Sequence, residues 1–66
     1  MKIRVNGESR EVESSLTLDE FLDSLKVLKQ TVVCELNCSI VNKAQYSETY
    51  LRDNDSLEIV HFVGGG

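Results

Sequence analysis

The chain has 66 residues, a formal net charge of −4 and 41% hydrophobic residues. A chain of this length buries only about 60% of the surface that its unfolded form exposes, so a deep catalytic cleft is hard to build on its core. The hydrophobic content is enough for a folded domain, and the acidic charge argues against nucleic-acid binding, which needs a basic surface. We therefore expect a binding or carrier domain rather than a stand-alone enzyme.

No apolar run approaches the roughly 20 residues that a membrane-spanning helix needs, and the first residues lack the features of a signal peptide. These absences predict a cytoplasmic protein that does not bind a membrane. Cys34 and Cys38 form neither a disulfide framework nor a C-x-x-C motif. We interpret Cys34 as a small buried residue and Cys38 as a turn residue. Together with His61 they are too few for a zinc site.

Residues 1–5 alternate between apolar and charged side chains, which predicts a strand with one solvated face. Asn6-Gly7 follows and is a strong hairpin signal, because both residues tolerate a positive φ. A second strand is predicted from about Ser9 to Glu13, with Val12 pointing inward.

The sequence Thr17-Leu18-Asp19-Glu20 matches a capping box, with Thr17 as the N-cap. Leu16 and Phe21 have the spacing of a hydrophobic staple. The leucines that follow keep a helical period, so the helix is predicted to run from Leu18 to about Leu28 and to bury this leucine stripe in the core.

Residues 31–36 are rich in β-branched side chains and predict a third strand, with Val32, Cys34 and Leu36 on one face. The next three residues predict a turn, and Ile40 and Val41 a short return strand. Residues 42–50 are polar and predict a loop with room for one helical turn, anchored by Tyr46 or Tyr50.

Leu51 is expected to be buried, and Asp53-Asn54-Asp55 predicts a tight turn with Asn54 in the left-handed conformation. The final strand is predicted from Ser56 to about Val63.

These elements predict an α+β fold in which one helix packs across a mixed sheet of four to five strands. The last strand should lie in the centre, parallel to the first. Leu57 and Ile59 would then face the helix, whereas Val60 and Phe62 would form an exposed apolar patch on which a partner docks. His61 is interpreted as a structural or surface histidine rather than a catalytic one.

The sequence given closes on Gly64-Gly65-Gly66, which predicts a folded domain over residues 1–63 and a flexible tail over residues 64–66. Glycine loses the most conformational freedom on ordering and adds little to a fold. A slim carboxylate tail of this kind suits the narrow active site of a second enzyme.

The chain length, the element order, the acidic turn at residues 53–55 and the ending Glu58 to Gly66 resemble the ThiS family. This family comprises the sulfur carriers of thiamine thiazole biosynthesis, within the ubiquitin-like β-grasp group that also holds the molybdopterin carriers. The molybdopterin carriers tend to have prolines before the tail, and this chain has none.

The resemblance implies that an E1-like adenylyltransferase of the ThiF type uses ATP to adenylate the Gly66 carboxylate. Sulfur that comes indirectly from a cysteine desulfurase then replaces AMP, and the Gly66 thiocarboxylate gives its sulfur to a ThiG-type thiazole synthase. Gly64 and Gly65 would thread the tail into these active sites. The carrier itself would bind no cofactor and contribute no catalytic side chain.

Three alternatives stay open at this point. The chain could carry sulfur for another pathway, such as molybdopterin synthesis, or it could be a ubiquitin-like modifier that forms an isopeptide bond. It could also be a plain interaction domain whose glycines are idle. Because the sequence offers no convergent Ser/His/Asp, metal or phosphate-loop motif, an enzyme is the least favoured class.

Overall fold

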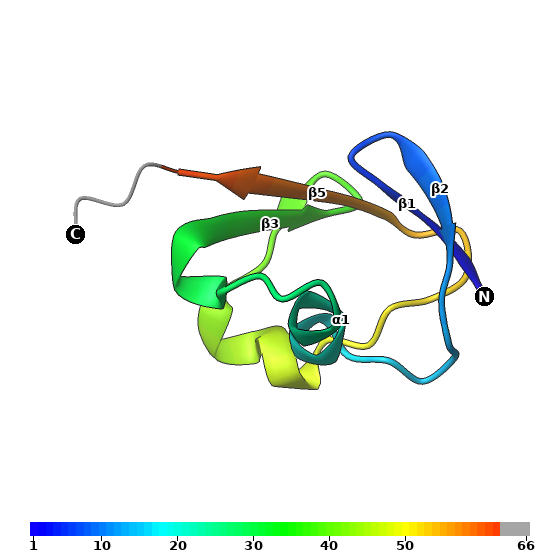
Figure 1. Cartoon of the computed structure of the whole chain (residues 1–66), viewed down its shortest axis with the longest axis horizontal. Helices are drawn as coiled ribbons and strands as arrows, with labels where there is room; N and C mark the ends of the chain where they lie inside the picture. The colour runs from blue at the N-terminus through cyan, green and yellow to red at the C-terminus, as the bar shows by residue number, and fades with distance from the viewer. Residues whose placement is uncertain (63–66) are drawn as a thin grey trace.

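Figure 1 shows a computed structural model of the chain, in which residues 1–62 are described. The predicted tail of Gly64, Gly65 and Gly66, the predicted domain boundary at residue 63 and the predicted end of the last strand at Val63 lie outside the described residues.

The described residues form one mixed sheet with strand order β2-β1-β5-β3-β4. β5 is parallel to β1 and antiparallel to β3, so the last strand lies in the centre of the sheet as predicted. The short helix α1 packs on one face, which confirms the predicted α+β fold (Figure 1). The strands are β1 (Lys2–Val5), β2 (Glu8–Glu11), β3 (Val32–Leu36), β4 (Ser39–Ile40) and β5 (Ser56–His61).

Both hairpins turn through two residues with positive φ. Asn6 and Gly7 have φ of 49° and 85°, and Asn37 and Cys38 have φ of 52° and 73°. Such turns match the right-handed twist of the flanking strands. The first turn places Val5 opposite Glu8, so β2 begins one residue earlier and ends two residues earlier than predicted.

Helix α1 spans Leu18–Ser24 and ends four residues earlier than the predicted Leu28. The Val27 N–H donates to the Leu22 carbonyl at 3.0 Å, and the Lys26 N–H donates to the Asp23 carbonyl at 2.9 Å. With Lys26 at φ 60°, this is a Schellman motif, which usually has glycine at the left-handed position. Lysine there gave no stop signal in the sequence, and Leu28 is 68% exposed instead of buried.

The predicted start of the helix is confirmed. The Thr17 hydroxyl accepts from the Glu20 N–H at 3.1 Å, and the Glu20 carboxylate accepts from the Thr17 N–H at 3.0 Å. This reciprocal pair satisfies backbone donors that the first helical turn leaves free.

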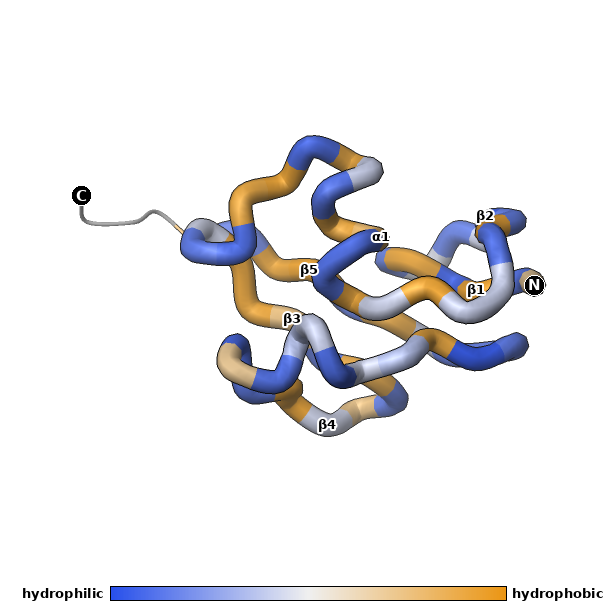
Figure 2. The backbone as a smooth tube through the Cα atoms, turned by 90° about the horizontal axis from the view of Figure 1, so that it is seen from below, coloured by the Kyte–Doolittle hydropathy of each residue, from blue (hydrophilic) through white to orange (hydrophobic). Residues whose placement is uncertain are grey.

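The core lies between the sheet and the segments that cover one face of it, α1 and the 3₁₀ helix η2 (Lys43–Glu48). Figure 2 shows hydrophobic stretches along the neighbouring strands β3 and β5. Tyr46 is the aromatic residue that anchors the 42–50 segment, whereas Tyr50 is exposed. The buried apolar residues are Ile3, Val5, Leu18, Phe21, Leu22, Val32, Cys34, Tyr46, Leu51, Leu57 and Ile59.

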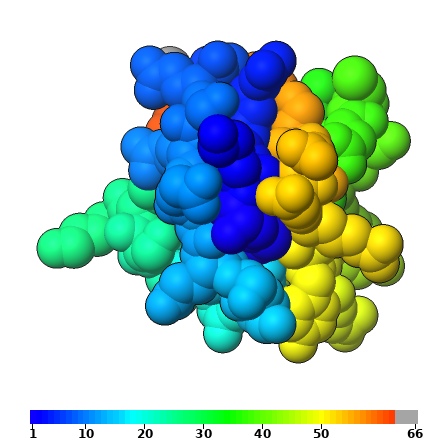
Figure 3. Space-filling view, turned by 90° about the vertical axis from the view of Figure 1, so that its right-hand side faces the viewer, coloured from blue at the N-terminus to red at the C-terminus, as the bar shows by residue number. Residues whose placement is uncertain are grey.

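The acidic turn before β5 packs against the N-terminal strand. The Asp53 carboxylate accepts from the Lys2 N–H at 2.7 Å, and the Asn54 N–H donates to the Lys2 carbonyl at 2.7 Å. Asn54 has φ 72°, as the sequence predicted. Figure 3 shows this segment, in gold, lying directly against the dark blue N-terminal residues. The turn therefore has a structural role: it sets where β5 enters the sheet.

Candidate functional site

The central strand β5 is held by β3 along its whole length. Its pairs with β3 run from Leu57 opposite Leu36 to His61 opposite Val32. The ladder is followed by one more hydrogen bond, from the Phe62 N–H to the carbonyl of Thr31 at 3.1 Å. Thr31 closes the 3₁₀ helix η1 (Lys29–Thr31). Backbone pairing thus reaches the last described residue before the predicted tail.

On its other side β5 is held by Asn6, beyond the end of β1. The Asn6 N–H donates to the Leu57 carbonyl at 2.9 Å. The Asn6 side chain then imitates a backbone partner of Ile59: its Oδ1 accepts from the Ile59 N–H at 2.7 Å, and its Nδ2 donates to the Ile59 carbonyl at 3.2 Å. β5 is therefore fixed on both sides up to Ile59.

Beyond Ile59 the chain presents the two residues that the sequence singled out for docking. Val60 is 53% exposed and Phe62 is 43% exposed. The Nζ of Lys43 lies 5.2 Å from the centroid of the Phe62 ring, a cation–π distance. His61 is also exposed, as expected for a surface histidine. Docking at Val60 and Phe62 stays a prediction.

The structure adds residues to this surface that the sequence reading missed. Val33 lies directly opposite Val60 on the neighbouring strand, and Ile40 on β4 lies opposite Glu35. Because residues in register share a face, Val33, Glu35, Ile40, Glu58 and Val60 all lie on the sheet face that points away from α1. We call this side the outer face. The alternation of side chains within residues 32–36 could have placed Val33 on the outer face. The position of Ile40 could not be predicted, because it depends on the register between β4 and β3.

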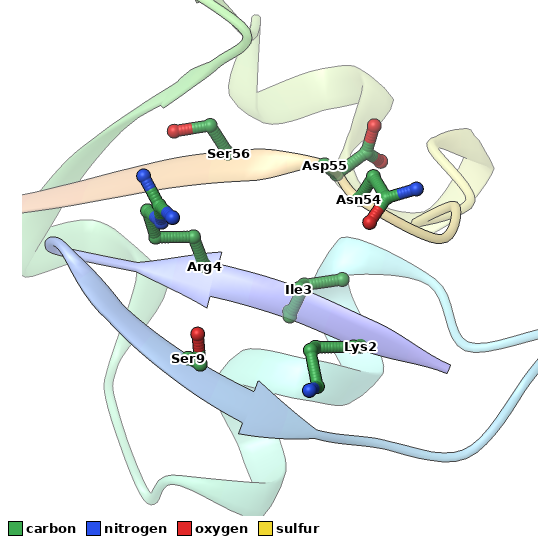
Figure 4. Close-up of a pocket in the computed structure, with 7 residues that line it drawn as sticks. All are labelled: Lys2, Ile3, Arg4, Ser9, Asn54, Asp55 and Ser56. Carbon is green, nitrogen blue, oxygen red and sulfur yellow. The ribbon is translucent and has the colours of Figure 1, made fainter.

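A depression of about 250 Å³ lies at the other end of the outer face, toward the N-terminus. Figure 4 shows the residues that line it: Lys2, Ile3, Arg4, Ser9, Asn54, Asp55 and Ser56. The lining contains two serine hydroxyls but neither a histidine nor a cysteine. The Asp55 carboxylate is occupied by hydrogen bonds to Arg52 and Asn37. These residues offer no serine nucleophile with an adjacent free base.

No group of three or more His, Cys, Asp or Glu side chains within residues 1–62 could hold a metal ion. No helix in the same range is long and apolar enough to cross a membrane.

The two cysteines have the structural positions that were expected from the sequence. Cys34 is fully buried, and burial raises the pKa of its thiol from 9.0. A protonated, inaccessible thiol is a poor nucleophile, because the thiolate is the reactive form. Cys38 is exposed at one of the two left-handed positions of the β3–β4 turn, and neither cysteine forms a disulfide.

Comparisons with known proteins agree with one another. The sequence model of the ThiS family matches residues 3–66. The sulfur carrier protein ThiS of Bacillus subtilis is 44% identical over 50 residues, which cover 76% of each chain. The crystal structure of the thiamine biosynthesis protein ThiS from Geobacter metallireducens superposes with a TM-score of 0.86 and 35% identity, and the match covers 100% of both chains.

A second kind of relative is larger. The thiazole synthase of Paramagnetospirillum magneticum is 42% identical over all 66 residues, and that of Magnetococcus marinus is 38% identical. The chain spans 20% of the length of each of these proteins. Matches over nearly the whole chain, in both sequence and structure, show that this protein belongs to the ThiS family and has its ubiquitin-like β-grasp fold.

Proposed function

We propose that this chain is a sulfur carrier of thiamine biosynthesis, and that the sulfur is carried as a thiocarboxylate at Gly66. The observation that carries the proposal is the position of β5. This strand is central, paired on both sides, and followed in the sequence directly by Val63 and three glycines. A tail that follows such a strand would start from a fixed position. A partner that binds the sheet would therefore have its active site at a defined distance from the start of the tail.

The chemistry follows from the inertness of a carboxylate. An ATP-dependent activating enzyme joins a Gly66 oxygen to the α-phosphorus of ATP and releases pyrophosphate. The acyl adenylate now has AMP as a good leaving group. The terminal sulfur of a persulfide, supplied through a cysteine desulfurase, displaces AMP at the carbonyl carbon and gives an acyl disulfide. A thiol then reduces this disulfide and releases the Gly66 thiocarboxylate, which passes its sulfur to the thiazole synthase. Gly64 and Gly65 keep the tail narrow enough to enter both active sites.

In this proposal the carrier is a co-substrate and not an enzyme, and it binds no cofactor of its own. Val60 and Phe62 supply a docking surface beside the tail, and the protein works in the cytoplasm with the activating enzyme and the synthase.

The first test is the intact mass of the protein recovered from its native cells without alkylating or strongly reducing treatment. The carrier proposal expects a fraction in which one oxygen has been replaced by sulfur, mapped to Gly66 as the terminal residue. A fraction joined through Gly66 to lysines of other proteins would favour a protein modifier instead. An unmodified chain under high sulfur demand would remove the main support of the proposal.

The second test separates the tail from the fold. Deletion of Gly65 and Gly66 should abolish thiazole formation in a reconstituted system, while the thermal unfolding midpoint stays at the wild-type value. A matched control is Gly7→Asn, which alters a glycine outside the tail, keeps a residue that tolerates the positive φ of this turn and should leave the transfer of sulfur intact. Retained activity after the deletion would mean that the glycines are idle.

A further inference from the structure

Two glutamates lie opposite each other on the outer face, on the neighbouring strands β3 and β5. Glu35 on β3 lies directly opposite Glu58 on β5 in an antiparallel register. Side chains in such positions have Cβ atoms about 4.5–5.5 Å apart, and like charges placed there destabilise a sheet. Glu35 is half-buried, so one of the two charges is also partly removed from water.

No described cation neutralises this pair. The ion pairs found within residues 1–62 join the Met1 amino group to Glu11 and Lys29 to Asp19. Arg4, the basic residue on the nearest part of β1, is in register with Ser56, two residues before Glu58. Residues 63–66 carry no cationic side chain.

Apolar side chains flank the pair on two sides. The next position along the same two strands holds Val33 opposite Val60, and Ile40 lies opposite Glu35 on the β4 side. Ile40 is 69% exposed and Val60 is 53% exposed. Water screens an ion pair less once such a surface is covered, so a cation placed here by a partner would be bound more strongly than on an open polar surface.

We propose that the Glu35–Glu58 pair is the charged centre of the docking surface, and that an arginine or lysine of the thiazole synthase binds it. Apolar residues of the synthase that surround this cation cover Ile40 and Val60 of the carrier. This proposal rests on the proposed function, since it names how one of the carrier's partners recognises it. An arginine suits the position well, because its fork of N–H donors can reach carboxylates on two strands.

The synthase is favoured as the occupant by the two relatives that are named thiazole synthases. In each, a segment similar to the whole of this chain is part of one polypeptide with that name. The carrier unit and the synthase are thus found together. The charge layout also favours one docking orientation, because Glu35 and Glu58 lie on β3 and β5, whereas the basic residues Lys2 and Arg4 lie on β1 toward the other end of the same face.

The test measures the dissociation constant between the full chain and the purified thiazole synthase of the same organism, by calorimetry at low and high salt. The double variant E35Q/E58Q removes both charges and keeps the side-chain shapes. We expect at least about tenfold weaker binding at low salt, with a reduced dependence on salt. The thermal unfolding midpoint of this variant should be equal to or above that of the wild type, because the repulsion between the strands is relieved.

The matched control is E8Q/E13Q, which changes net charge by the same amount at exposed positions in and after the edge strand β2. Its affinity should stay within about twofold of the wild type, because isolated surface charges contribute little. Equal weakening by both double variants would mean that only net charge matters, and it would overturn the proposal. Wild-type affinity in E35Q/E58Q would overturn it as well.

Two other results would overturn the choice of partner. If E35Q/E58Q weakens binding to the ATP-dependent activating enzyme but not to the synthase, the carboxylate pair serves the activating enzyme. If the wild-type chain does not bind the synthase at all, the proposal fails. The mass of the protein at Gly66 then decides whether the proposed carrier function fails as well. A thiocarboxylate there would keep the carrier function with another acceptor, whereas an unmodified Gly66 would end both proposals.

Discussion

The Asn37 side chain donates from Nδ2 to Oδ1 of Asp55 at 2.9 Å and so joins the β3–β4 turn to the turn that precedes β5. The contact is reinforced by the backbone of Ser56, whose N–H donates to Asn37 Oδ1 at 2.9 Å and whose carbonyl accepts from the Asn37 N–H at 2.8 Å. The second Asp55 oxygen accepts from the Arg52 N–H at 2.7 Å. Two loops far apart in sequence are thereby locked together.

Asp55→Ala should destabilise the protein by about 2–3 kcal/mol, because the Asn37 amide and the Arg52 N–H both lose a charged acceptor in a poorly solvated place. Urea unfolding measures the change in free energy. The control is Asp23→Ala on the exposed side of α1, where a change within about 0.5 kcal/mol is expected. Equal costs at the two positions would contradict the locking role of Asp55.

Asn6→Gly should cost about 1–3 kcal/mol, because it removes both side-chain hydrogen bonds to Ile59 while keeping a residue that tolerates φ 49°. Asn6→Ala should cost about 1 kcal/mol more, since alanine is strained in the left-handed region. Unfolding by urea gives the free energies, and hydrogen exchange of the Ile59 amide should accelerate in both variants. Unchanged exchange at Ile59 would show that β3 alone holds this part of β5.

Thr17→Ala should lower the free energy of unfolding by about 1 kcal/mol, because a helix of seven residues depends on its cap. Glu20→Gln is the matched control: glutamine can still accept from the Thr17 N–H, so its effect should be a few tenths of that value. Thermal unfolding followed by circular dichroism would compare the two. A larger loss in Glu20→Gln than in Thr17→Ala would mean that charge at the helix terminus, and not capping, is the main effect.

Tyr46 should make the protein less stable in alkali. Burial, together with hydrogen bonding to Cys34, raises the pKa of Tyr46 from 10.0 to about 12. The unfolded chain loses this proton near pH 10, whereas the folded chain keeps it. The contribution of Tyr46 to the free energy of unfolding is therefore fully present below pH 10 and is lost as the pH rises from 10 toward 12.

Tyr46→Phe removes the titrating group and should flatten the fall in unfolding free energy between pH 10 and 12. Part of the fall should remain, because the pKa of the buried Cys34 is raised as well. Urea unfolding at a series of pH values gives both slopes. A slope in Tyr46→Phe as steep as that of the wild type would contradict the assignment to Tyr46.

Phe62→Ala should weaken binding to the activating enzyme or to the synthase with little loss of stability. The ring is 43% exposed, and its contact with the Lys43 cation is worth about 0.5–1 kcal/mol. Leu57→Ala, on the buried side of the same strand, should instead cost about 2–5 kcal/mol. A stability loss in Phe62→Ala as large as that in Leu57→Ala would place Phe62 in the core.

Local signals in the sequence determined much of this fold, because each acts between residues that are near in the chain. Asn6-Gly7 fixed a hairpin through its positive φ angles, and Thr17 with Glu20 fixed the start of α1. The alternation in the last strand correctly placed Leu57 and Ile59 in the core and left Val60 and Phe62 exposed. The role of Gly66 also came from the sequence and from the family resemblance, and it remains a proposal.

Tertiary structure alone decided which strands meet and in which register. The end of α1 at Ser24 was missed because the left-handed position of its Schellman motif holds Lys26, and lysine carries no glycine signal. Asn6 beside Ile59, Asn37 beside Asp55 and Glu35 opposite Glu58 join residues 18 to 53 positions apart. Such contacts depend on the relative placement of whole strands, so no local pattern of side chains could have specified them.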